Sequence, residues 1–264
     1  MFRWPDKVDW RGFYMLPKLW VEDRAWANLS LSGKAVFVVV ARHANEKGEC
    51  RPGEERIARM AGLTEKTTRQ ALNDCEDMDL LRIQRYTTVR GQRAKRYKLN
   101  TAQGKWIQMT HALTDSGVWQ YLTPTARAVY VAMRHYGWWE LDTYCDLIGE
   151  DIHPDDLKET YATRRFDICQ ADGGLLADFA GITTRSLHAA KVSLHKHHLI
   201  DNAGEHLADD GILVYLRPYS GNPEKPCLWY KRSHLNELTM KAAKREGRHK
   251  KKGRASDAVS TSWP

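Results

Sequence analysis

Apolar side chains in the first hundred residues gather in three successive segments, and in the second and third of these they recur at helical spacing. The segment Ala35–Val40 is apolar throughout, so β-propensity alone would also allow a buried strand there. The segment Glu54–Ala61 has one apolar face, formed by Ile57, Ala58 and Ala61. The segment Glu65–Asp77 has an inward stripe of Thr68, Ala71, Leu72 and Cys75. The second and third segments are therefore predicted to be helices.

Turn and cap residues separate these segments and lead into a hairpin. Gly62 predicts the left-handed residue that ends a helix, and Thr64 is placed to cap the next one. Beyond the third helix, Leu80–Tyr86 and Lys95–Leu99 alternate in polarity on either side of Gly91, which is typical of a two-stranded hairpin. Helix, tight turn, helix and hairpin follow one another in winged helix-turn-helix domains.

The same pattern occurs twice in the chain. Phe13–His43 aligns without a gap with Trp106–Tyr136 at an offset of 93 residues, and Ile57–Thr64 matches Leu176–Thr183 at an offset of 119. The second copy of the long apolar segment replaces Val by Ala and Met, so both copies are predicted to be helical. Ser30 or Ser32 is the expected N-cap of the first, and Thr123 or Thr125 of the second. In the second copy, the inward stripe of the third helix is Leu187, Ala190 and Leu194, and Lys191 takes the place of Leu72.

The repeat predicts a mainly α fold with small β hairpins, an α+β protein built of tandem winged helix-turn-helix domains. We expect a first domain over residues 1–100 and a second over 101–238. The second copy carries 26 more residues, which we assign to an acidic insertion at about 138–170. Its aromatic and acidic residues suit either a protein-facing surface or a helical elaboration of its own domain. Residues 239–264 are expected to form a basic, disordered tail.

Charge separates these regions. The chain carries 41 Lys and Arg against 33 Asp and Glu, with a pI near 9.2, which favours a polyanionic partner. The net charge is +7 over residues 1–100, −5 over 101–238 and +6 over 239–264. The first domain and the tail are therefore the expected phosphate-facing parts, the tail either as a nonspecific clamp or as a solubilising end.

Double-stranded DNA is the expected partner because the third helix of each copy has an outward polar face. A helix in the major groove reads bases with such side chains, and a basic hairpin beside it holds phosphates. The alternative is an ordinary solvated helix face. In the first domain the candidates are Lys66, Thr67, Arg69, Gln70 and Asn73 on the helix, with Arg90, Arg93 and Lys95 on the hairpin. In the second they are Arg185, Ser186, His188 and Lys191, whereas its hairpin, Asn202–Gly211, is acidic and would repel phosphate.

No catalytic or metal-binding motif is expected to operate here. The sequence has no phosphate-binding loop, no His-Glu-x-x-His and no Gly-x-Ser-x-Gly, so we predict no enzyme activity and no cofactor. Cys145, His153 and Cys169 match no common zinc spacing, and the five scattered cysteines are expected to be reduced. The cluster His195–His198 is interpreted as a helix C-terminus.

The longest apolar run, Ala35–Ala41, is too short to span a bilayer. The first residues lack a secretion signal. A cytoplasmic protein without membrane contact is therefore expected.

Four stretches of the first domain stand out as a set: Phe13–Leu19, Leu29–Val36, Ala41–Pro52 and Ile57–Thr64. Together they resemble the winged-helix replication initiators of bacterial plasmids and phages. The resemblance covers residues 13–100 well and 106–200 loosely. It implies binding to repeated origin sites and recruitment of a replicative helicase or other replication proteins. A transcriptional regulator of a mobile element, a helicase- or primase-loading adaptor, and a homodimer all stay open.

Overall fold

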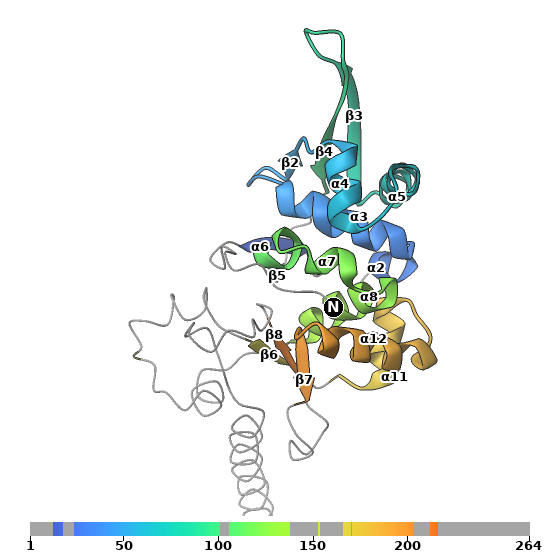
Figure 1. Ribbon diagram of the computed structural model, residues 1–264, viewed down its shortest axis with the longest axis vertical. Helices are drawn as coiled ribbons and strands as arrows, with labels where there is room; N and C mark the ends of the chain where they lie inside the picture. Colours follow the sequence, from blue (N-terminus) through green and yellow to red (C-terminus); the bar gives the residue numbers. More distant parts are fainter. Residues whose placement is uncertain are drawn as a thin grey trace, which may run out of the picture.

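The computed structural model describes residues 13–17, 24–100, 106–137, 153, 166–169, 171–202 and 212–215 (Figure 1). The predicted basic tail 239–264, most of the predicted insertion 138–170 and residues 203–211 of the predicted second hairpin lie outside these ranges. The described part is an α+β structure of short helices and small antiparallel sheets, which confirms the predicted class at that level.

The first unit, residues 13–100, begins with strand β1 (Phe13–Pro17) and four helices. These are α2 (Ala25–Asn28), α3 (Leu31–His43), α4 (Glu54–Ala61) and α5 (Glu65–Asp77). The long apolar segment is the helix α3, capped by Ser30, whose side chain accepts a hydrogen bond from the Gly33 amide. A helix is favoured because this segment is buried on all sides, among α4, α5 and the second unit.

The turn between α4 and α5 has the predicted geometry. Gly62 ends α4 in the left-handed region, with φ at 63°, and Thr64 caps α5 by accepting a hydrogen bond from the Thr67 amide. The whole predicted stripe of α5 is buried. Its residues are Thr68, Ala71, Leu72 and Cys75.

A three-stranded antiparallel sheet completes the first unit, in the order β2-β4-β3. Its strands are β2 (Glu49–Cys50), β3 (Leu81–Thr87) and β4 (Arg93–Leu99). Leu81 pairs with Leu99 and Ile83 with Tyr97, and all four side chains are buried at the base of the hairpin. The rest of the hairpin projects beyond the helices, at the top of Figure 1.

The second unit, residues 106–215, repeats this plan with one additional short helix, α6, among the described residues. It contains β5 (Trp106–Thr110), α6 (His111–Asp115), α7 (Val118–Tyr121), α8 (Pro124–Tyr136), β6 (Phe166–Cys169), α11 (Gly173–Ala180), α12 (Thr184–Lys196), β7 (Ile200–Asn202) and β8 (Ile212–Tyr215). The sheet order β6-β8-β7 matches β2-β4-β3, and Cys169 follows Cys50 at the repeat offset of 119. The end of the predicted insertion, Phe166–Cys169, is therefore a strand of the repeated unit.

The two units meet along a seam with approximate two-fold symmetry, which we define by β1, β5 and two tryptophans. Strand β1 pairs antiparallel with β5, and the central pair is Met15 with Gln108, which are equivalent residues in the two copies. Trp26 Nε1 donates to the Ala128 carbonyl at 3.3 Å, and its equivalent Trp119 donates to the Ala35 carbonyl at 3.1 Å. The two bonds therefore join equivalent residues of the two copies, in opposite directions.

Two glycines make the same reciprocal contact across the seam. A Cβ on Gly62 would lie 2.7 Å from the Gln120 carbonyl oxygen, and a Cβ on its equivalent Gly181 would overlap the Ala27 carbonyl. Residues 27 and 120 are themselves equivalent, at the offset of 93. Both glycines also have positive φ, so their backbones need glycine twice over, for conformation and for space.

Buried cations line the short helices next to the seam. Lys34 Nζ donates to the carbonyls of Ala27 and Leu29, and at the equivalent position Arg127 donates to the carbonyls of Trp119 and Gln120. These bonds satisfy carbonyls at helix ends that have no helical partner. The buried apolar residues of both units form one continuous cluster, so the seam is part of the core.

A buried ion pair is present in the second unit. Arg134 of α8 pairs with Asp167 of β6, and their side chains are 1% and 3% exposed. Arg134 also donates to the carbonyl of Gln108, 2.7 Å away, at the centre of the β1–β5 pair. The equivalent positions in the first unit are Ala41 and Gly48, so this link between seam and sheet has no ionic counterpart there.

Candidate nucleic-acid interface

The outward face of α5 carries most of the predicted helix candidates. Its apolar stripe packs on α3 and α4, which leaves the opposite face to solvent. Thr67 is half-buried there, and its hydroxyl lies 2.9 Å from that of Thr64, so part of its hydrogen-bonding capacity serves the cap. The exposed members of this face are Lys66, Arg69, Gln70 and Asn73.

The hairpin of β3 and β4 changes character along its length. On one face the buried pairs at its base give way to Arg85 opposite Lys95 and then to Thr87 opposite Arg93. Arg90 lies in the exposed turn, beside Val89, whose side chain is fully exposed. The same strand pair is therefore anchored by apolar side chains at one end and presents cations at the other.

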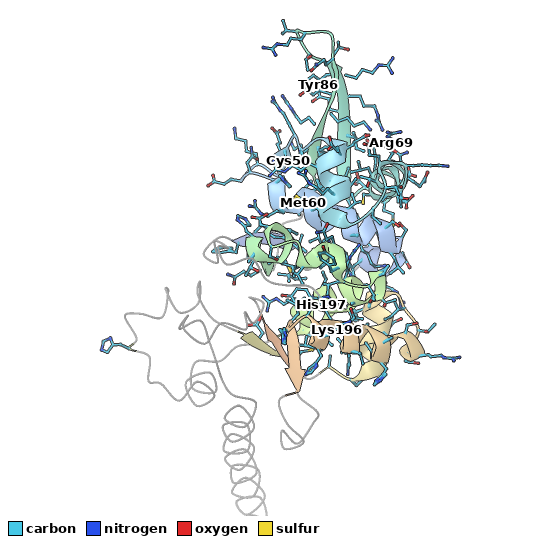
Figure 2. All side chains as sticks on the ribbon, in the orientation of Figure 1. Cys50, Met60, Arg69, Tyr86, Lys196 and His197 are labelled. Carbon is cyan, nitrogen blue, oxygen red and sulfur yellow. The ribbon has the colours of Figure 1, made fainter. Side chains whose placement is uncertain are left out.

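The hairpin and α4 border an open hollow of about 760 Å³. Its wall includes Gly53 and Glu54 at the start of α4. Its cationic side chains are Arg51, Arg85, Arg93 and Lys95. Figure 2 shows Arg69 beside the base of the hairpin that carries Tyr86 further out, so α5 and the hairpin adjoin. Arg69 of the helix candidates and Lys95 of the hairpin candidates are thus close together in the first unit.

Glu54 connects the helix candidates with the hairpin candidates. This residue was not among the candidates predicted from the sequence. Its carboxylate accepts a hydrogen bond from Arg69 Nε at 2.9 Å and also pairs with Lys95 Nζ. Arg69 reaches Glu65 as well, at 3.0 Å. Desolvation disfavours the Glu54 carboxylate, but the bonds from Lys95 and Arg69 outweigh it and lower the pKa of Glu54. Arg69 and Lys95 are therefore held by a carboxylate that stays ionised near neutral pH.

Gln70 is also engaged within its helix. Its side-chain amide donates to Asp74 at 3.0 Å, and Asp74 accepts a second hydrogen bond from Ser30 at 2.6 Å. A base contact by Gln70 would have to exchange or share the first of these bonds. No contact of Lys66 or Asn73 with another side chain is recorded among the described residues, so their polar groups are directed to solvent.

The candidates of the second unit lie on α12, at positions that match α5. Arg185 and His188 are exposed, and Ser186 and Lys191 are half-buried. The Thr183 cap accepts from the Ser186 amide, and the two hydroxyls lie 3.0 Å apart, as at Thr64 and Thr67. Unlike α5, α12 carries no carboxylate. The tip of the second predicted hairpin lies outside the described residues.

The remaining candidates of the sequence carry little chemistry in the described ranges. Helix α12 ends at Lys196 as predicted, and His197 Nδ1 lies 2.7 Å from the Ser193 carbonyl oxygen. Cys50, Cys75 and Cys169 are free and buried, and burial raises the pKa of Cys50 to about 12. Within the described residues no cluster of three His, Cys, Asp or Glu could hold a metal, and no helix could cross a membrane.

Comparison with protein-family models, with curated proteins and with solved structures found no match for this chain.

Proposed function

We propose that this protein binds double-stranded DNA in a sequence-specific manner, with the first unit acting as a winged helix. In this proposal α5 enters the major groove, where Lys66 and Arg69 suit guanine, and Gln70 and Asn73 suit adenine. Arg90 and Arg93 of the hairpin hold phosphates and supply affinity without much sequence information. The observation that carries the proposal is the exposed polar face of α5 directly beside a cationic hairpin.

The structure of that surface supports nucleic acid over a small acidic ligand. Its cations extend from α5 along the hairpin to the exposed turn at Arg90, whereas a small ligand would need convergent groups in an enclosed site. A duplex presents phosphates along its whole length, and an extended row of cations can contact several of them. We propose no catalytic activity, cofactor or metal for this function.

The biological role we propose is replication initiation on a plasmid or phage, through origin repeats and recruitment of replication proteins. Its support is the sequence resemblance, together with the acidic composition of the predicted insertion before strand β6, which suits a protein partner. The alternative is a transcriptional regulator of a mobile element. A footprint on DNA of the host element separates the two, because clustered repeats favour an initiator and a single operator over a promoter favours a regulator.

The DNA-binding proposal is tested with full-length protein and duplexes selected from a random pool. Lys66→Ala and Asn73→Ala should each cost about 1–3 kcal/mol on the selected site and little on random DNA. Arg90→Ala with Arg93→Ala should weaken both duplexes equally and flatten the salt dependence. Lys47→Ala, an exposed cation on the turn before β2, is the control for loss of charge alone. Equal loss of specificity in the helix and hairpin variants would contradict the placement of α5 in the groove.

A further inference from the structure

The approximate two-fold symmetry extends from the seam to α5 and α12. Ser30, before α3, donates to Asp74 on α5, and the equivalent Thr123 amide lies 3.5 Å from the hydroxyl of Ser193 on α12. Helix α5 therefore sits on α3 as α12 sits on α8. In Figure 1 both helices lie on the side of the body away from β5. One chain thus presents two matching helices related by a two-fold operation.

A two-fold relation between two DNA-reading helices reverses the direction in which they read. Homodimeric helix-turn-helix proteins bind inverted half-sites for this reason, because the dyad of the protein coincides with a dyad of the duplex. Tandem domains on a flexible linker would be free to read direct repeats. Here a continuous core and the β1–β5 pair fix the two units against each other.

We propose that a single chain occupies DNA with both units and recognises two half-sites in inverted orientation. This inference rests on the proposed DNA-binding function and adds the second unit and the symmetry of the site to it. The centres of the half-sites should be separated by about one helical turn, about 10 base pairs, or a multiple of it.

The half-sites should be related but unequal. Near the start of the two helices the chemistry is shared, with Lys66 matching Arg185 and Arg69 matching His188. One and two turns further on it diverges: Gln70 and Asn73 match Ala189 and Val192. Val192 is 53% exposed, an apolar side chain suited to a thymine methyl where Asn73 suits adenine. The expected sequence is an imperfect palindrome whose two half-sites match at one end and differ at the other.

Charge on α12 agrees with a DNA contact by the second unit. This helix carries Arg185, Lys191 and Lys196 and no carboxylate, whereas α5 carries two cations and four carboxylates. The acidic hairpin predicted at 202–211 would weaken phosphate contacts beside α12. The helix itself is nevertheless more favourable to a polyanion than α5, so the second half-site relies on the helix.

The experiment selects duplexes from a random pool with the full-length protein, sequences them, and measures the mass of the complex by sedimentation. The expected result is an imperfect inverted repeat bound by one chain. Lys66→Ala should relax selection in one half-site and Arg185→Ala in the other, each by about tenfold in discrimination. Lys47→Ala should leave both halves unchanged. Circular dichroism and thermal unfolding confirm that the variants fold.

The outcomes separate this inference from the proposed function. A selected direct repeat, a single half-site insensitive to Arg185→Ala, or two chains per inverted repeat would overturn the inference while leaving DNA binding in place. No enrichment of any sequence would overturn the sequence-specific binding on which both depend.

Discussion

The two units have the same arrangement of helices and strands, but their residues match in some regions and differ in others. Residues common to both include several at the seam and at helix ends, such as Trp26 and Trp119 or Thr64 and Thr183, and several in the core. The exposed face differs: where α5 has Asn73, α12 has Val192. The duplication therefore preserved the residues that join and terminate the helices and varied those that face solvent.

This contrast indicates two kinds of constraint. A residue at the seam must fit its own unit and the other unit at once, because the tryptophan bonds and the glycine contacts there occur twice, once in each direction. A residue on the outer face of α5 or α12 must fit only a partner outside the chain. The pair Arg134 and Asp167 is an exception, because it is buried and yet present in the second unit alone. It therefore provides the strongest test of the comparison.

The largest expected effect follows from removing Asp167. The change Asp167→Ala leaves the guanidinium of Arg134 buried without its carboxylate, which should lower the free energy of unfolding by about 3–5 kcal/mol. Urea denaturation followed by circular dichroism measures the loss. The control is Asp115→Ala, which breaks an exposed pair with Arg42 and should cost about 1 kcal/mol or less. Equal costs for the two changes would show that burial of the Arg134 pair contributes nothing to stability.

The next effect compares the two seam glycines. Gly181→Ala should lower the free energy of unfolding by about 2–3 kcal/mol and Gly62→Ala by about 1–2 kcal/mol. Both changes strain a positive φ, but the added methyl group meets the Ala27 carbonyl more severely at Gly181. Gly91→Ala, with a positive φ and open space around the methyl, isolates the cost of conformation. If all three variants lose the same stability, the close approach at the seam is not a constraint.

Local signals explain why the helices could be predicted from sequence. The bounds of α4 and α5 follow from an apolar stripe, a left-handed glycine and a capping threonine, each of which acts within a few residues. The assignment of α3 as a helix needed its second copy, where Ala and Met replace Val. The ion pair between Arg69 and Glu65, four residues apart on one helix, is local in the same way.

Non-local contacts were not predicted. Strands β1 and β5 pair across about ninety residues, and no local pattern in either names its partner. Glu54 reaches Arg69 and Lys95 from a different element, so the spacing of the three residues carries no signal. Strand β6 was assigned to the insertion, although Cys50 and Cys169 hold the repeat offset and could have revealed it. The boundary between domains at residues 100 and 101 stays a prediction.

A smaller effect tests the charge difference between the units at Glu54, whose equivalent in the second unit is Gly173. In the proposed DNA complex, Glu54→Gln removes a carboxylate that repels phosphate and holds Arg69 and Lys95. Affinity for duplex DNA should rise about threefold to tenfold at low salt, with a steeper salt dependence. Fluorescence anisotropy measures both. Glu55→Gln, an exposed neighbour on α4, controls for net charge, and a weaker complex for Glu54→Gln alone would mean that orienting the two cations matters more than repulsion.

The smallest effect compares Lys34 with its equivalent Arg127. Burial lowers the pKa of Lys34 to about 8 and that of Arg127 to about 10. In the unfolded chain Lys34 keeps its proton up to about pH 10.5, so between pH 8 and 10.5 this side chain binds more protons in the unfolded state, and its own contribution to stability rises with pH. The gain is complete above the unfolded pKa and is lost as the pH falls through 8.

We therefore expect Lys34 to contribute a rise of about 1 kcal/mol in the free energy of unfolding from pH 8 to pH 9.5. The contribution is measured by urea denaturation as the difference between the unchanged protein and Lys34→Arg at each pH. The difference is needed because burial raises the pKa of Cys50 from 9.0 to about 12, so over this range the thiol ionises in the unfolded chain and lowers the stability of both proteins alike. Lys34→Arg gives the first unit the cation of the second, whose lowered pKa still lies above this range, so it lacks the contribution of Lys34. A difference that does not change with pH would mean that the hydrogen bonds from Lys34 to Ala27 and Leu29 keep its ammonium charged despite burial.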